Sequence, residues 1–203
     1  MRSRLLASIV MGFLVLGLPG MSHAAEHPAE AVIRHLCDTL IEMMKAGDKL
    51  GFKGRVEKLK PLIPAVYDMP SMTQSTLGTA IAAKLTQDET AKLIDLYTRF
   101  SVATYASQFN DWDGERFEID EPRPSTAGAI ILPSRIVPKT GEPTEIHYVM
   151  RQEQGHWKVV DVLFEGTISQ VAVRRSEFVS IFRSKQFSGL MEALEKQTAS
   201  LEK

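Results

Sequence analysis

The chain has 203 residues, with 24 Lys plus Arg against 25 Asp plus Glu, and a single cysteine. This near-neutral balance argues against a nucleic-acid-binding protein, which needs a clustered basic excess to contact phosphates. The length fits one domain with a sizeable core, and Cys37 has no partner for a disulfide within the chain, so we expect a buried thiol on the first helix.

The first 24 residues have the pattern of a cleaved secretory signal. Arg2 and Arg4 form a basic segment, an apolar run covers residues 5–18, and Ser22-His23-Ala24 places small residues before a cleavage site. A retained membrane anchor is the alternative, but it needs about 20 apolar residues to span a bilayer. We therefore expect residues 1–24 to be removed and residues 25–203 to form one exported domain.

Helical patterns occupy the first half of the chain. Pro28 lies near the start of an amphipathic segment that Gly47 ends. A second helix is predicted from about Asp48, and it should be cut by Pro61 and Pro64, because proline lacks the backbone N–H that a helix interior uses.

Two further helices follow before the pattern changes. Pro70 opens a short one. Thr86-Gln87-Asp88-Glu89 is typical of a capping box, in which the Thr86 hydroxyl accepts from the Glu89 amide. This box predicts the start of the longest helix, which should run to about Phe109.

From Phe117 onward, apolar residues alternate with period two and β-branched residues are enriched. The segments predicted as strands are Phe117–Asp120, Ala129–Val137, Glu145–Gln152 and His156–Glu165. Short loops make them sequential neighbours, and the last should be covered on both faces because both are apolar. Thr167–Gln170 can cap a following helix, with Gly189 in a final helix or at the junction before it. Helices followed by hairpin-linked strands predict an α+β fold, with helices stacked on one face of an antiparallel sheet.

The last third of the chain carries a resemblance to a known family. Trp157-Lys158-Val159, Asp161-Val162, Glu165-Gly166, Ser169 and then Arg175-Ser176-Glu177-Phe178 resemble, in order and spacing, the signature of the MlaC family. These are the periplasmic lipid-carrying components of bacterial ABC-type retrograde transport systems, also called toluene-tolerance proteins. Gly166-Thr167-Ile168-Ser169 and Arg174-Arg175-Ser176-Glu177-Phe178 are closer still to its hopanoid-associated HpnM branch.

The resemblance covers most of the mature chain. Sequence motifs similar to those of this branch also occur at Tyr67-Asp68 with Met72, at Ala103-Thr104-Tyr105-Ala106 and at Gly114-Glu115-Arg116-Phe117. One departure concerns the last motif: many MlaC-type sequences have Asn-Tyr before the Arg, where this chain has Val173 and Arg174. A phospholipid-specific contact at these positions is therefore not carried over.

The resemblance implies a fold and a function. The fold is a curved antiparallel sheet of about four strands, similar to the nuclear-transport-factor type, which encloses an apolar cavity with N-terminal helices and is followed by C-terminal helices. The implied function is that of a soluble periplasmic carrier. It shuttles a lipid, which is either a hopanoid or a phospholipid, between an inner-membrane transport complex and the outer membrane. We expect a monomer that docks transiently on membrane surfaces.

The candidate lipid site consists of apolar residues on two opposed surfaces. An apolar stripe is normally plain core, and the resemblance is the main reason to expect a cavity here. Flexible methionines support it, because they can line adaptable pockets. The candidates are Met69 and Met72, then Leu93, Leu96, Tyr97, Phe100 and Ala103 on the long helix, and Ile146, Tyr148, Met150, Val160, Val162 and Phe164 on the sheet. Lys53, Arg55 and Arg175 are candidates for the cavity mouth, where they would meet a polar head.

Motifs for catalysis, metals and nucleotides are absent from the sequence. There is no His-Glu-x-x-His, no Gly-x-Ser-x-Gly and no phosphate-binding Gly-rich loop, so we expect no metal, no cofactor and no ATP hydrolysis. The mature histidines are not spaced as metal ligands; they are His27, His35, His147 and His156.

Asp161 keeps an enzymatic alternative open. Its carboxylate lies among valines and a leucine, where burial is costly unless the group is paired, and a strand carboxylate in such a sheet can serve as a general base. The structural alternative is that Asp161 accepts hydrogen bonds from backbone amides or from an arginine, with Arg175 as the candidate. A third possibility is a cargo-free structural adaptor of the transport complex with a solid core.

We predict export with cleavage after Ala24, because the basic segment, the apolar run and the small residues at 22 and 24 follow in the required order. Intact-mass analysis of a periplasmic fraction should give a chain that begins at residue 25. A mature protein that begins before residue 20, or one that remains in the membrane fraction, would contradict this prediction.

Overall fold

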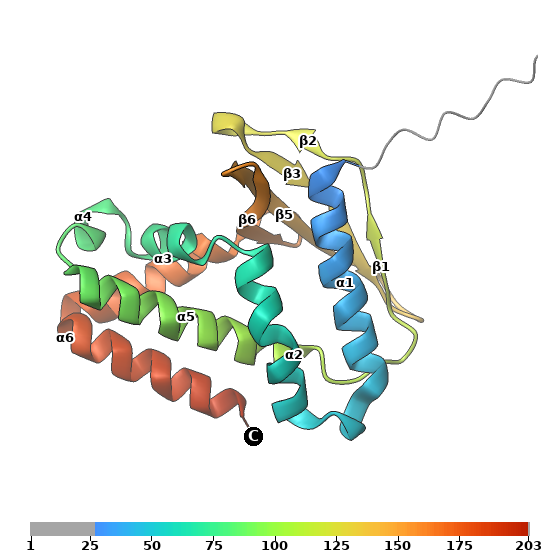
Figure 1. Cartoon of the computed structure of the whole chain (residues 1–203), viewed down its shortest axis with the longest axis horizontal. Coiled ribbons are helices and arrows are strands. Elements are labelled where there is room, and N and C mark those ends of the chain that lie inside the picture. The colour runs from blue at the N-terminus through green and yellow to red at the C-terminus, as the bar shows by residue number, and fades with distance from the viewer. Residues whose placement is uncertain (1–26, 203) are drawn as a thin grey trace, which may run out of the picture.

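The computed structural model describes residues 27–202, so the predicted signal segment lies outside the described part of the chain. Helices α1 to α5 precede the strands, and the long α6 follows them (Figure 1). In Figure 1, α1 runs along the sheet, and α2 lies between α1 and α5. The predicted α+β architecture, with helices against a curved antiparallel sheet, is confirmed.

The helices begin and end largely where the caps predict. Their bounds are α1 (Pro28–Ala46), α2 (Gly51–Val66), α3 (Met69–Leu77), α4 (Thr79–Ala82), α5 (Gln87–Gln108) and α6 (Gln170–Leu201), with short 3-10 turns at Gly47–Lys49 and Thr126–Gly128. The capping box of α5 is present: the Glu89 amide donates to Thr86 Oγ1 at 3.2 Å and the Thr86 amide donates to Glu89 Oε2 at 2.9 Å. Ser169 caps α6 by accepting from the Ala172 amide at 2.9 Å.

The prolines of α2 do not cut the helix, contrary to the prediction. Pro61 and Pro64 lie inside Gly51–Val66, and both are exposed. The carbonyls they leave without a helical donor belong to residues 57 and 60, which are also exposed and can bond to water. On the opposite side of α2, Leu59, Leu62, Ile63 and Val66 are buried, and this packing offsets the cost of the prolines.

The sheet is built around its two longest strands. Its members are β1 (Arg116–Ile119), β2 (Arg123–Pro124), β3 (Ile130–Leu132), β4 (Ser134–Val137), β5 (Thr144–Glu153), β6 (His156–Phe164) and β7 (Ile168–Ser169). One edge of β5 pairs with β3 and β4, and its other edge pairs with β6. The predicted segment 129–137 is thus divided at Pro133, and the short β2 and β7 extend the sheet beyond the four predicted strands.

A β-bulge in β6 changes which residues face the helices. Val149 pairs with Asp161 but Met150 pairs with Val159, so Val160 is the extra residue. Residues opposite each other share a face of the sheet, so Val159 joins Val162 on the face of Tyr148 and Met150. The prediction placed Val160 there, because strict period two cannot reveal a bulge.

The last strand is covered less completely than predicted. Val159 is fully buried, but Phe164 at the end of β6 is 40% exposed. The middle of β6 is therefore buried, whereas its end, near the turn that leads into β7, is exposed to solvent.

The long α6 is two helical arms joined by a sharp reversal. Gln186 has φ 56 and ψ −164, which interrupts the helix, and Figure 1 shows the second arm returning beside α5. Gly189 lies just after this point and is buried in the second arm. A hydrogen bond from Gln197 Nε2 to Glu177 Oε1 joins the two arms.

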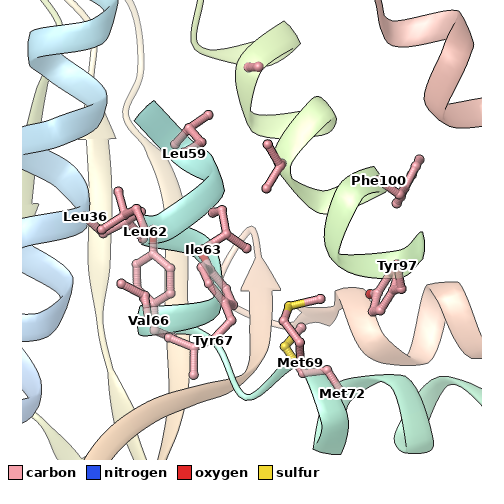
Figure 2. Packing of buried hydrophobic residues seen from close by; sticks show 14 of the residues in the cluster. Leu36, Leu59, Leu62, Ile63, Val66, Tyr67, Met69, Met72, Tyr97 and Phe100 are labelled. Carbon is pink, nitrogen blue, oxygen red and sulfur yellow. The ribbon is translucent and has the colours of Figure 1, made fainter. Parts of the chain in front are cut away.

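The core lies between α1, α2, α5 and the sheet. In α1 the buried residues recur at helical spacing and include Ile33, Leu36, Cys37 and Leu40. Figure 2 shows Leu36 close to Leu62 and Val66 of α2. Cys37 is buried as predicted, and burial raises the pKa of its thiol to about 12, so the thiol stays neutral.

Arg55 ties α2 to the end of α5. Its side chain is buried, and Nε donates to the carbonyl oxygen of Ala106 at 2.7 Å. Ala106 lies in the last turn of α5, where carbonyls have no intrahelical donor and where the helix dipole favours a cation. Arg55 is therefore part of the core and does not lie free at the surface.

Replacing Arg55 with Ala should lower the free energy of unfolding by about 2 kcal/mol, because a hydrogen bond from a charged group is lost and a buried carbonyl is left unpaired. Urea denaturation followed by circular dichroism measures this. The matched control is Lys53→Ala, an exposed position of the same helix, which should change stability by less than about 0.5 kcal/mol. Equal midpoints for the two variants would contradict the assigned role.

Candidate functional site

A cavity of about 440 Å³ lies between the helices and the sheet. Its walls come from the end of α2, from α3, from the second half of α5, from β4, β5 and β6, and from the first turns of α6. The apolar lining residues are Ile63, Met69, Met72, Phe100, Phe109, Ile136, Ile146, Val162 and Phe164, and the tyrosines are Tyr67, Tyr97, Tyr105 and Tyr148. A mainly apolar cavity of this size is suited to a hydrophobic ligand.

Many of the predicted lipid-site residues lie around this cavity. Those that line it are Met69, Met72, Tyr97, Phe100, Ile146, Tyr148, Val162 and Phe164. Figure 2 shows Met69 and Met72 between Tyr67 and the side of α5 that carries Tyr97. The two opposed surfaces inferred from helical and strand periodicity thus meet at the cavity.

The other predicted residues lie elsewhere. Leu93, Leu96 and Met150 are fully buried in the core and Ala103 is buried nearby, but none of them lines the cavity. They belong to the same stripes as lining residues, and periodicity does not distinguish a stripe that touches a cavity from one that touches packed side chains. Val160 is also absent from the lining, because the bulge moves it out of phase.

Sequence reasoning missed several lining residues at the end of α5 and its C-cap. Thr104, Tyr105, Gln108 and Phe109 line the cavity, and they continue the helical spacing of Tyr97 and its neighbours. The signal was present in the sequence, since helical spacing from residue 97 leads to positions 101, 104 and 108. Ile136 of β4 was also missed. The apolar residues of this short strand, Ile136 and Val137, are adjacent, so no alternation shows which of them faces the helices.

The tyrosines of the wall are neutral, and two of them are hydrogen-bonded to each other. The hydroxyls of Tyr67 and Tyr105 share a short hydrogen bond, and their rings meet edge to face with centroids 5.9 Å apart. Burial raises the pKa of Tyr105 to about 12 and holds the pKa of Tyr67 well above its usual range. The deep end of the cavity therefore carries no charge near neutral pH.

Arg174 brings a charge to the cavity wall. It stands on the first turns of α6, and its Nη1 donates to Glu177 Oε2 at 2.9 Å. Its guanidinium carbon lies 4.7 Å from the centroid of the Phe100 ring, within the range of a cation–π contact. The other polar lining residues are Ser101, Thr104, Gln108, Thr144 and Gln170.

The three residues predicted for the cavity mouth are not among the lining residues. Arg55 is held by the Ala106 carbonyl, and Lys53 is exposed on the same helix. Arg175 packs against Gly78 instead, so closely that a Cβ on Gly78 would meet its Nη2 at 2.7 Å. Gly78 has φ 72, a conformation that glycine adopts without strain.

Asp161 joins the sheet to the start of α6. Its Oδ1 accepts from the amides of Val162 at 2.8 Å and Val171 at 3.0 Å, and its Oδ2 accepts from Ser169 Oγ at 2.5 Å. The predicted backbone-amide partners are therefore present, whereas the predicted Arg175 partner is wrong, because Arg175 lies beside Gly78. Asp161 does not line the cavity, which removes the geometry that a general base would need.

Two further recesses are less suited to an apolar ligand. One, of about 860 Å³, lies between the α3–α4 junction and α6, and serines and arginines form much of its wall. The other, of about 560 Å³, lies between α1 and β1 and is bordered by charged residues of both signs. Across residues 27–202, no group of three or more His, Cys, Asp or Glu side chains is placed to hold a metal ion. None of the described helices is both long and apolar enough to cross a membrane.

Comparison with known proteins adds two findings. The sequence model described as MlaC protein matches residues 34–196 of the chain. Among solved structures, the chain is similar to a phospholipid-binding protein from Ralstonia solanacearum, determined in complex with a phospholipid. That match has a TM-score of 0.72 and 20% sequence identity, and it covers 87% of this chain and 100% of the other, which establishes a shared fold. No curated protein matches the chain.

Replacing Asp161 with Asn should lower the free energy of unfolding by about 2 kcal/mol, because the two amides and the hydroxyl that donate to it lose a charged acceptor. The measurement is urea denaturation. Asp95→Asn is the control, since Asp95 is exposed and forms a surface ion pair with Arg99 on α5. If Asp161→Asn is as stable as the unsubstituted protein but loses its lipid-related activity, the carboxylate has a chemical role and the structural assignment is wrong.

Proposed function

The chain belongs to the MlaC family, and from this premise we propose that it is a lipid carrier that holds a hydrocarbon tail in the cavity between α3, α5, α6 and the sheet. The observation that carries the proposal is the cavity itself, with its apolar and aromatic walls. The phospholipid bound to the similar Ralstonia solanacearum protein supports a lipid as the ligand class.

The physical reason for such a carrier is the cost of exposing a tail to water. Each methylene group gains about 0.8 kcal/mol when it leaves water for an apolar environment. A cavity lined by Met, Phe, Ile and neutral Tyr side chains supplies that environment. Apolar contacts have no preferred direction, so a cavity of this kind selects a ligand by the volume and shape of its tail.

The cavity of about 440 Å³ lies within the size range of pockets that hold small hydrophobic ligands. Phe164 lines the cavity and is 40% exposed, so the cavity reaches solvent on this side and part of a larger lipid can extend out of it.

The proposal extends to the route of the lipid. We place the mature protein, residues 25–203, in the periplasm as a monomer that takes its lipid to or from an inner-membrane transport complex and exchanges it with the outer membrane. The resemblance of Gly166–Ser169 and Arg174–Phe178 to the HpnM branch makes a hopanoid a candidate cargo beside a phospholipid. An enzyme that uses Asp161 as a base is disfavoured, since both carboxylate oxygens are occupied away from the cavity.

Native mass spectrometry of protein purified without detergent tests whether a lipid is carried. We expect a population with an added mass that organic extraction releases as lipid. An empty protein, even after expression in cells rich in the candidate lipids, would favour the cargo-free adaptor.

Replacing Val162 with Glu should empty the cavity without unfolding the protein. Val162 lines the cavity, so the carboxylate can be hydrated inside it while excluding an apolar tail. The matched controls are Leu93→Glu, which buries a charge in the packed core and should unfold the chain, and Val160→Glu, which lies off the cavity and should keep both fold and lipid. Thermal melting by circular dichroism and lipid extraction are measured on the same samples. Unfolding of Val162→Glu to the same extent as Leu93→Glu would mean that Val162 is ordinary core.

A further inference from the structure

Arg174 is the one charged side chain among the residues that line the cavity in the described part of the chain. A hydrocarbon tail gains nothing from a guanidinium, and a cation next to an apolar cavity loses part of its hydration. Its side chain is 29% exposed, so it lies between the apolar interior and solvent. This is the position in which the polar end of an amphiphile would lie when its tail fills the cavity.

Two contacts hold the guanidinium in place, and a third fixes one of its partners. The Phe100 ring lies beneath it at 4.7 Å, and Glu177 accepts from Nη1 at 2.9 Å. Glu177 is itself fixed, because its Oε1 accepts from Gln197 in the second arm of α6. A group already held by two contacts loses little freedom when it binds a ligand, which favours recognition at this point.

The same contacts leave part of the guanidinium available. Arginine carries five N–H donors, and only the Nη1 donor has an acceptor among residues 27–202. Nε and Nη2 can therefore donate together to a planar or tetrahedral anion, the bidentate geometry in which arginine binds carboxylate and phosphate. A neutral hydroxyl accepts only one such bond at a time and brings no charge.

We propose that Arg174 is a specificity-determining residue that recognises an anionic head, a carboxylate or a phosphate, of the amphiphile whose tail occupies the cavity. The inference rests on the proposed lipid-carrying function and adds the class of ligand to it. Glu177 weakens the preference for an anionic head group, because its carboxylate competes with the ligand for the same guanidinium. The neighbouring Arg175 has no part in it, since its guanidinium lies against Gly78 on another side of α6.

The test compares three ligands that share one tail: dodecanoate, dodecyl phosphate and dodecanol. Each displaces the neutral fluorophore N-phenylnaphthylamine from delipidated full-length mature protein, at about 0.15 M ionic strength to suppress long-range attraction. We expect the two anions to bind about tenfold more tightly than dodecanol, a ratio that corresponds to about 1.4 kcal/mol. The ratio of the affinities for dodecanoate and dodecyl phosphate shows which of the two head groups the site prefers.

Variants assign the preference to Arg174. In Arg174→Gln the ratio of anion to alcohol affinity should fall to about one, Arg174→Lys should retain part of it, and Arg175→Gln should keep the full ratio. Glu177→Gln should raise the ratio, because the competing carboxylate is removed. Circular dichroism melting confirms that each variant is folded, and if Arg174→Gln is not, the Arg174→Lys and Glu177→Gln results decide.

Each outcome bears on a definite claim. If dodecanol binds as tightly as the anions, or if Arg174→Gln keeps the preference for anions over dodecanol, the cavity carries a lipid but Arg174 does not recognise its head group. An unchanged or lower ratio in Glu177→Gln has the same consequence. If none of the three ligands displaces the fluorophore, the proposed lipid site fails, and the role of Arg174 fails with it.

Discussion

The carboxylate of Asp161 is the contact on which the cavity depends. It accepts from an amide of its own strand, from an amide in the first turn of α6 and from the hydroxyl that caps this helix, so it fixes the direction in which α6 leaves the sheet. The first arm of α6 then places Arg174 over Phe100 and packs Phe178 against Tyr97, whose ring centroids lie 5.6 Å apart. The wall of the cavity that α6 supplies is therefore anchored to β6 by the Asp161 carboxylate.

A cavity of this kind needs well-packed walls, because a flexible core would collapse into it. The walls here are aromatic rings in contact with one another, such as Tyr97 stacked on Phe100 and Tyr105 stacked on Phe109. Such pairs are favourable in themselves, beyond the area that they bury. The methionines of α3 supply the opposite property, since their unbranched side chains can adapt to the ligand. Empty space costs stability, and a ligand that fills it restores the lost contacts.

Local signals in the sequence predicted the parts of the fold that local chemistry determines. Pro28 and Gly47 bounded α1, the Thr86–Glu89 box began α5, and alternation located the four main strands. The bulge at Val160, the uninterrupted α2 and the reversal at Gln186 depend on what packs against each segment, which periodicity does not contain. The same limit applies to the site: stripes on α5 and the sheet could be identified, but only the packing shows which members face the cavity.

The reversal of α6 brings its second arm back to a side chain that contacts the cavity wall. Gln197 holds Glu177, and Glu177 holds Arg174, so the charge at the rim is set by a residue more than twenty positions downstream of it. None of the described residues of the second arm lines the cavity, yet this arm holds the carboxylate that in turn holds the guanidinium. A change in how the second arm packs would therefore reach the cavity through these two side chains.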